Sequence, residues 1–179
     1  MITPISQASS RIYARAAGIA FLVYIAADMA SMGVASQPHV ASAFTLLGSL
    51  SALVLGVTLY KITRAQGPAL ALLALTCRVV ESVSAQGAIF FAVGSTLFCW
   101  LLLRGRMIPT ALAWFGVIAS ALLVVLLPLQ LAGLLGGSMP WSASLTWLQW
   151  IPMLVFELTL AVWLMIKGVA IPAMQPASL

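Results

Sequence analysis

Charged side chains are rare in this chain: its 179 residues include eight lysines and arginines and three acids, so only 6% are charged. A soluble domain carries about 25% charged residues, which cover its surface. The shortage excludes a water-soluble enzyme and a disordered chain. Instead, 63% of the residues are hydrophobic, and the mean hydropathy is +1.15. This composition predicts an integral membrane protein that crosses the lipid bilayer several times.

Residues that bind metals or form disulfides are also few. The two cysteines, Cys77 and Cys99, both lie within apolar runs. A disulfide framework or a zinc site needs more ligands than these. Motifs for phosphate binding and for nucleophile–base catalysis are missing as well. We therefore expect no metal and no cofactor, and we interpret both cysteines as small packing residues.

Six apolar runs are separated by short junctions that contain glycine, proline, serine and glutamine. A helix that crosses a bilayer needs about 20 apolar residues. Region 69–103 is divided at Gln86 and Gly87, because a single helix there would be about 50 Å long against a hydrocarbon core of about 30 Å. The predicted spans cover approximately residues 14–33, 41–60, 69–84, 88–103, 110–134 and 145–166.

Basic residues mark alternate junctions between the runs. Junctions 33–40, 84–87 and 135–144 contain no lysine or arginine. With six spans, every basic junction falls on one side of the membrane, which the positive-inside rule identifies as the cytoplasm. The pattern predicts an all-α bundle of six transmembrane helices, one domain over residues 1–179, with both termini cytoplasmic. The seven basic residues at the cytoplasmic ends of the runs, called junction residues below, are Arg11, Arg15, Lys61, Arg64, Arg104, Arg106 and Lys167.

This placement also explains the net charge of +5, which could otherwise indicate a nucleic-acid partner. The basic residues flank membrane spans and do not form a continuous binding surface, so we expect no nucleic acid. Tryptophans at the outer edge of the last span are typical of the aromatic belt at a membrane interface and need no ligand-binding role. They are Trp141, Trp147 and Trp150.

Four charged residues lie inside the spans, where each costs at least ~2.5 kcal/mol on insertion scales. They are Asp28, Arg78, Glu81 and Glu157. Counted along the helices, Arg78 and Glu157 lie about 13 Å from the cytoplasmic side, and the other two lie about 18 Å from it. The matched depth predicts an ion pair between Arg78 and Glu157. We expect Glu81 on the same guanidinium or on a nearby water, and Asp28 facing Glu81 from the first span.

One arginine cannot neutralise three acids, so at least one carboxyl group is expected to be protonated at neutral pH. The imbalance predicts a pocket between the first, third and sixth spans, lined by Asp28, Glu81 and Glu157 and open to the outer half of the bilayer. The alternative is a tightly packed polar cluster that only fixes how the helices fit together, with no cavity beside it.

Small residues recur at every fourth position of two spans. Gly48, Ala52 and Gly56 form such a row in the second span, and Gly116 and Ser120 do so in the fifth. Rows of this kind let helices approach closely in lipid. We expect them to serve packing within the bundle more than contact with a second copy.

Several segments resemble one known family. They are Ala14 to Gly18, Arg78-Val79-Val80-Glu81, the stretch 91–116 and the closing stretch 156–168. Together, over roughly residues 12–170, they resemble a bacterial family of multi-pass membrane proteins, domain of unknown function 4386. The resemblance implies a six-helix protein of the bacterial inner (cytoplasmic) membrane and places Arg78, Glu81 and Glu157 in the family's pattern. It implies no reaction.

Three functions fit these observations. The first is an intramembrane enzyme of the isomerase, cyclase or epoxide-opening hydrolase type that acts on a lipid- or terpenoid-like substrate. Its catalytic carboxyl groups would be Glu81, Glu157 and Asp28, with Arg78 orienting the ligand or an acid. The second is a non-catalytic accessory subunit of a larger membrane assembly. The third is a small carrier or proton-coupled transporter. The expected partners are the bilayer, a hydrophobic small molecule, and a second copy or a larger membrane complex.

Overall fold

The computed structural model describes residues 7–84, 86–134 and 144–170, and the described part of the chain is helical throughout apart from its turns. Each predicted apolar run corresponds to one helix, and the predicted division of region 69–103 is confirmed. The first helix begins earlier than its apolar run. The helices are α1 (Gln7–Gly33), α2 (Pro38–Thr63), α3 (Pro68–Val83), α4 (Gly87–Arg104), α5 (Thr110–Leu131) and α6 (Ser144–Ile166).

Local sequence explains where several helices begin and end. Pro38 and Pro68 stand in the first turn of α2 and α3, where the missing backbone N–H would have no partner in the helix. The chain leaves α3 in an extended conformation at Ser84 and re-enters a helix at Gly87. The turn predicted near residues 136–140 and Trp141 lie outside the described residues.

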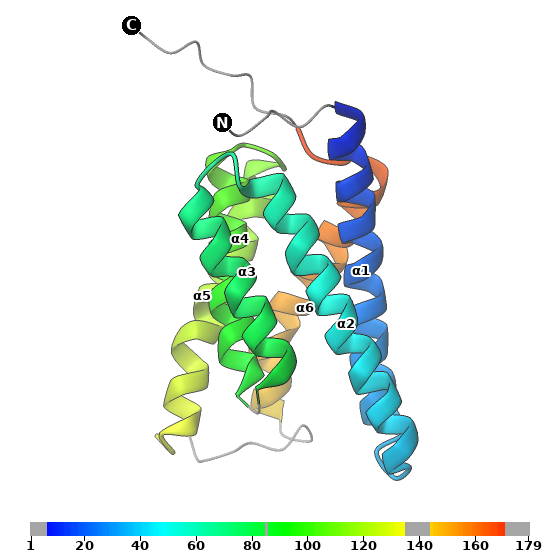
Figure 1. The fold of residues 1–179 in the computed structure, drawn as a ribbon. Helices are drawn as coiled ribbons and strands as arrows, with labels where there is room; N and C mark the ends of the chain where they lie inside the picture. The colour runs from blue at the N-terminus through cyan, green and yellow to red at the C-terminus, as the bar shows by residue number, and fades with distance from the viewer. Residues whose placement is uncertain (1–6, 85, 135–143, 171–179) are drawn as a thin grey trace, which may run out of the picture.

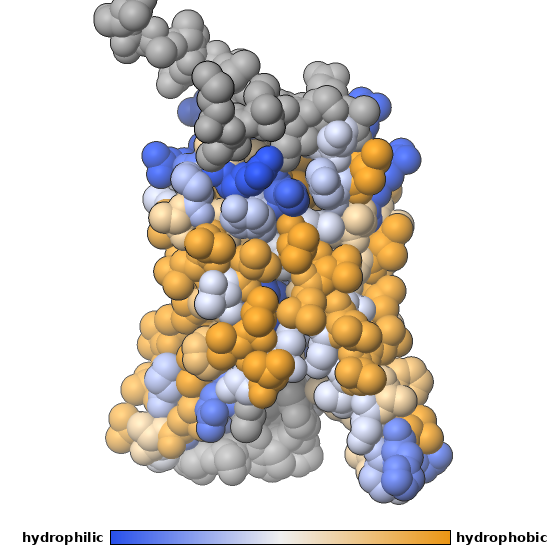
Figure 2. Space-filling model, in the orientation of Figure 1, coloured by the Kyte–Doolittle hydropathy of each residue, from blue (hydrophilic) through white to orange (hydrophobic). Residues whose placement is uncertain are grey.

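Consecutive helices run antiparallel, so α1 begins and α6 ends at the same end of the bundle, the upper end in Figure 1. This end holds the seven basic residues of the junctions. A broad hydrophobic band lies below it, and hydrophilic residues return at the opposite end (Figure 2). We call these the basic end and the far end.

Five of the described helices (α1, α2, α4, α5 and α6) are long and apolar enough to cross a membrane. The exception, α3, has 16 residues and is about 24 Å long at ~1.5 Å per residue. Many large apolar side chains point outward from the bundle, including Leu46, Ile118 and Ile166. Such an exterior suits lipid rather than water.

Glycines bring neighbouring helices into close contact. A Cβ atom at Gly56 of α2 would lie 3.0 Å from the Cβ of Arg78 on α3, and one at Gly116 of α5 would lie 2.4 Å from the Phe156 ring on α6. Gly48 of α2 faces Asp28 of α1 in the same way. The predicted small-residue rows therefore pack helices within the bundle, and the α2 row also backs two of the four charged residues.

Candidate functional site

The ion pair at the centre of the site joins two residues of α3. Arg78 Nη1 lies 2.9 Å from Glu81 Oε2, and the two side chains are 2% and 8% exposed. The predicted pair between Arg78 and Glu157 is wrong. Equal depth did not identify the partner, because a carboxylate three residues along the same helix is already within reach of the guanidinium. The prediction that Glu81 contacts the Arg78 guanidinium is correct.

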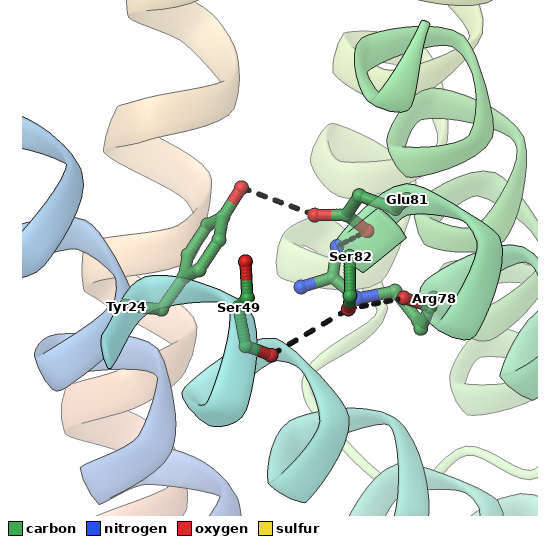
Figure 3. Close-up of polar contacts among 5 residues, drawn as sticks. All are labelled: Tyr24, Ser49, Arg78, Glu81 and Ser82. Carbon is green, nitrogen blue, oxygen red and sulfur yellow. Dashed lines mark hydrogen bonds and ion pairs between the residues drawn. The ribbon is translucent and has the colours of Figure 1, made fainter. Parts of the chain in front are cut away.

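Tyr24 of α1, which was not predicted from the sequence, completes the surroundings of this pair. Its hydroxyl donates a hydrogen bond to Glu81 Oε1 at 3.2 Å (Figure 3). Its ring lies 5.3 Å from the guanidinium carbon of Arg78, and the ring of Phe91 on α4 lies 5.1 Å from that carbon. Rings at this distance attract a cation through their faces. A usable signal was present: Tyr24 precedes Asp28 by four residues and so shares its face of α1.

The Ser82 hydroxyl group links α3 to the backbone of α2 beside the ion pair. The Ser82 hydroxyl lies 2.9 Å from the backbone oxygen of Arg78 and 3.5 Å from that of Ser49 (Figure 3). The first contact follows the common pattern in which a serine bonds to the backbone one turn earlier. The second is a long contact that links α3 to α2 beside the ion pair.

Some buried polar atoms near the pair have no hydrogen-bond partner. These include Nε and Nη2 of Arg78, Oε2 of Glu81, which meets the guanidinium only as an ion pair, and Oε1 of Glu157. Glu157 of α6 is 4% exposed. An unpaired buried acceptor loses its contacts with water without replacement, which costs about 1–3 kcal/mol and more for a charged group. The Glu157 carboxyl group is therefore the polar group here that most needs a further donor.

A cavity of about 540 Å³ lies beside these residues. The predicted pocket is confirmed in position, because Asp28, Glu81 and Glu157 all line it. Residues of α2 and α4 also contribute, which was not predicted. Arg78 does not line this cavity and lies behind Glu81, Tyr24 and Phe91, which do. The aromatic lining residues are Tyr24, Phe91, Trp147 and Trp150.

Trp147 and Trp150 correct an interpretation made from the sequence. They were interpreted as parts of an interfacial belt with no role at a ligand site, but both line the cavity. The ring of Trp150 lies 5.7 Å from that of Phe91, and Phe91 in turn flanks Arg78. One aromatic wall therefore runs from the ion pair toward the start of α6.

The cavity lies in the half of the bundle away from the basic end. Its lining includes Met32, near the end of α1, and Ser84 and Gly87, between α3 and α4. Figure 2 shows the molecule hollowed at the far end, between the α1–α2 hairpin and the other helices. The buried ion pair lies further toward the centre of the bundle.

A helical bundle with an apolar exterior, and with acids gathered on an internal cavity, defines a membrane protein with a polar site inside its hydrophobic band. The model of a family described as Domain of unknown function (DUF4386) matches residues 83–168. The resemblance expected from the sequence is confirmed over this range, which is slightly less than half of the chain. The match includes Glu157 but begins after Arg78 and Glu81. No curated protein and no solved structure matches the chain.

Proposed function

We propose that this protein binds a lipophilic molecule in the cavity and isomerises it by proton transfer. The observation that carries the proposal is the contrast between two acids on one cavity wall. Glu81 is paired with Arg78 and accepts a hydrogen bond from Tyr24. Glu157 is almost completely buried and has an oxygen atom without a partner. Acid–base chemistry uses such pairs, in which one carboxyl group is kept ionised and the other neutral.

The proposed roles follow from these surroundings. Glu157 donates a proton to a carbon–carbon double bond or an oxygen atom of the substrate, and Glu81 removes one from a neighbouring carbon. One proton is added to the substrate and one is removed from it, so the isomerisation needs no further reactant. Return of a proton from Glu81 to Glu157 restores both carboxyl groups for the next turnover. Arg78 is a positioning residue that keeps Glu81 ionised. Asp28, nearer the end of α1, contributes a third carboxyl group to the cavity.

The test compares the lipids that accompany the protein. Wild type, Glu157→Gln and Ser120→Ala are extracted with their native lipids in polymer nanodiscs, and bound lipophiles are identified by mass spectrometry. Ser120 is a matched control because it is fully buried in α5, bonds to the Gly116 oxygen and does not line the cavity. Removal of a general acid lowers a rate by about 10²–10⁴-fold. Glu157→Gln should therefore retain the unconverted isomer, and Ser120→Ala should match wild type.

Two outcomes would overturn this proposal. Identical isomer ratios in wild type, Glu157→Gln and cells lacking the protein would exclude proton transfer by Glu157. If no lipophile accompanies any variant, and Glu81→Gln instead separates the protein from a larger complex on native gels, the accessory-subunit function would replace the enzyme.

The proposed membrane arrangement has six spans in the bacterial inner membrane, with both termini in the cytoplasm. It is supported by the antiparallel order of the helices, which brings the seven junction lysines and arginines to one end of the bundle. Cytoplasmic loops concentrate such residues. In this orientation the cavity faces the outer half of the bilayer, where a membrane-dissolved molecule can enter from the side.

A further inference from the structure

We infer that the molecule bound in this cavity is a lipophilic organic cation. The inference rests on the proposed function only in that the cavity holds a lipophilic molecule, and it does not depend on proton transfer. It assigns the cavity a ligand charge opposite to that of its wall. Three features support it: the acidic charge of the cavity lining, an unpaired buried oxygen atom of Glu157 and the aromatic side chains of the lining.

The charges that face the cavity are all acidic. Asp28, Glu81 and Glu157 line it, whereas Arg78 is 2% exposed and lies outside the lining. The remaining lysines and arginines lie at the basic end, away from this half of the bundle. Arg78 pairs with Glu81, so two further carboxyl groups face the cavity without a basic partner in the described residues. A cation in the cavity supplies the missing charge.

Glu157 gives this inference a specific charged group. The residue lines the cavity, and its Oε1 atom is enclosed by protein without a hydrogen-bond partner. The Glu157 carboxyl group is neutral in the absence of a ligand, as the proposed function requires. In the low dielectric of a membrane interior, a nearby positive charge stabilises the ionised form of a carboxyl group far more than it does in water, so this group releases its proton when the cation binds. A cationic ligand therefore supplies the Glu157 carboxyl group with a compensating positive charge that no described residue supplies by direct pairing.

The aromatic wall suits the same ligand. Tyr24 and Phe91 already hold one cation, the Arg78 guanidinium, at 5.3 and 5.1 Å from its central carbon. Trp150 extends this wall from Phe91 along the cavity. Aromatic faces combined with carboxylates are a recurring way to bind organic ammonium groups. A volume of about 540 Å³ lies within the range of small-molecule sites, about 300–1,000 Å³.

The experiment uses two ions of nearly equal shape and opposite charge, tetraphenylphosphonium and tetraphenylborate. Binding of each to the full chain in phosphatidylcholine nanodiscs is measured by equilibrium dialysis, with empty nanodiscs as the blank. Wild type should bind tetraphenylphosphonium saturably and tetraphenylborate no more than the blank. Glu157→Gln and Asp28→Asn should each weaken cation binding at least about tenfold, the equivalent of ~1.4 kcal/mol. Ser120→Ala should bind as wild type does.

Asp28→Glu keeps the charge and should keep binding within about threefold, equivalent to less than ~1 kcal/mol. It thereby separates loss of charge from loss of fold. Equal binding of the two ions, or unchanged cation binding in both neutralised variants, would overturn the inference. If a neutral lipophile accompanies the protein but the cation does not bind, the inference fails and the proposed function stands. If the cation binds but Glu157→Gln leaves every lipid isomer unchanged, the inference stands and the proposed function fails.

Discussion

At the scale of single residues, Arg78 organises the interior of the bundle. One of its nitrogen atoms pairs with Glu81, and its guanidinium carbon lies 5.3 Å from the ring of Tyr24 and 5.1 Å from the ring of Phe91. Two other nitrogen atoms have no partner. A buried charge that is only partly paired depends strongly on each partner that it has, because loss of one leaves the charge without compensation.

Glu81→Ala should therefore destabilise the protein strongly. Removal of one member of a buried ion pair costs about 3–5 kcal/mol, because the other charge remains in the apolar interior. The measurement is the free energy of unfolding in micelles. Thr76→Ala is a suitable control on α3, since Thr76 is exposed and bonds only to its own helix. The double variant Glu81→Leu with Arg78→Met should recover part of the loss, and no recovery would contradict the ion-pair explanation.

Tyr24 is expected to act through both its hydroxyl group and its ring. Tyr24→Phe removes the hydrogen bond to Glu81 and should cost about 0.6–1.7 kcal/mol, the range for hydrogen bonds between membrane helices. Tyr24→Leu also removes the ring beside Arg78 and should cost a further ~0.5–2 kcal/mol. Unfolding of the two variants under identical conditions measures both terms. Equal losses in the two variants would show that the ring contributes nothing.

At the scale of helices, close approach depends on the absence of a side chain. Gly116 lies in the middle of α5, where alanine is the better helix former. A Cβ atom there would nevertheless meet the Phe156 ring at 2.4 Å and the Cys99 sulfur at 2.8 Å. The contact between α5 and its neighbours α4 and α6 therefore depends on this one position.

Gly116→Ala should lower stability by about 1–3 kcal/mol, the usual cost of an overpacked core. Gly33→Ala is the matched control, because nothing lies within 4 Å of a Cβ atom at Gly33. Thermal unfolding in the same detergent compares the two variants. A partner substitution, Phe156→Leu, should relieve the clash in the Gly116→Ala protein. A Gly116→Ala protein as stable as wild type would contradict the close packing.

The helix boundaries could be predicted from the sequence because they depend on local composition. The signals are local in the sequence: a proline in the first turn, a run of apolar residues, and a basic residue at the end of that run. The partner of Arg78 could not be predicted, because it depends on which way each helix turns its faces. Tyr24 was missed because a neutral tyrosine inside a span gives no signal comparable to a charge. The shared cavity of three acids was predictable, because their imbalance is a property of composition.

At the scale of the whole molecule, the antiparallel order of the six described helices places successive junctions at alternate ends of the bundle. Reporter fusions at residues 37 and 86 should give an external signal, and fusions at 65 and 106 a cytoplasmic one. The reason is the alternation of bare and basic junctions along six antiparallel helices. A cytoplasmic signal at residue 86 would show that α3 and α4 do not cross the membrane as two separate spans.

The short third helix makes bilayer thickness a determinant of this protein's behaviour. In the proposed six-span arrangement, α3 is about 24 Å long against a hydrocarbon core of about 30 Å, so it has to be accommodated by local thinning of the lipid or by neighbouring helices. Glu81 lies two residues before α3 ends at Val83, so thinning brings hydrated headgroups toward the cavity mouth. Mismatch costs fractions of a kcal/mol per Å. The protein should consequently unfold less readily in bilayers of short acyl chains than in those of long ones, and it should concentrate in the thinner regions of a mixed membrane.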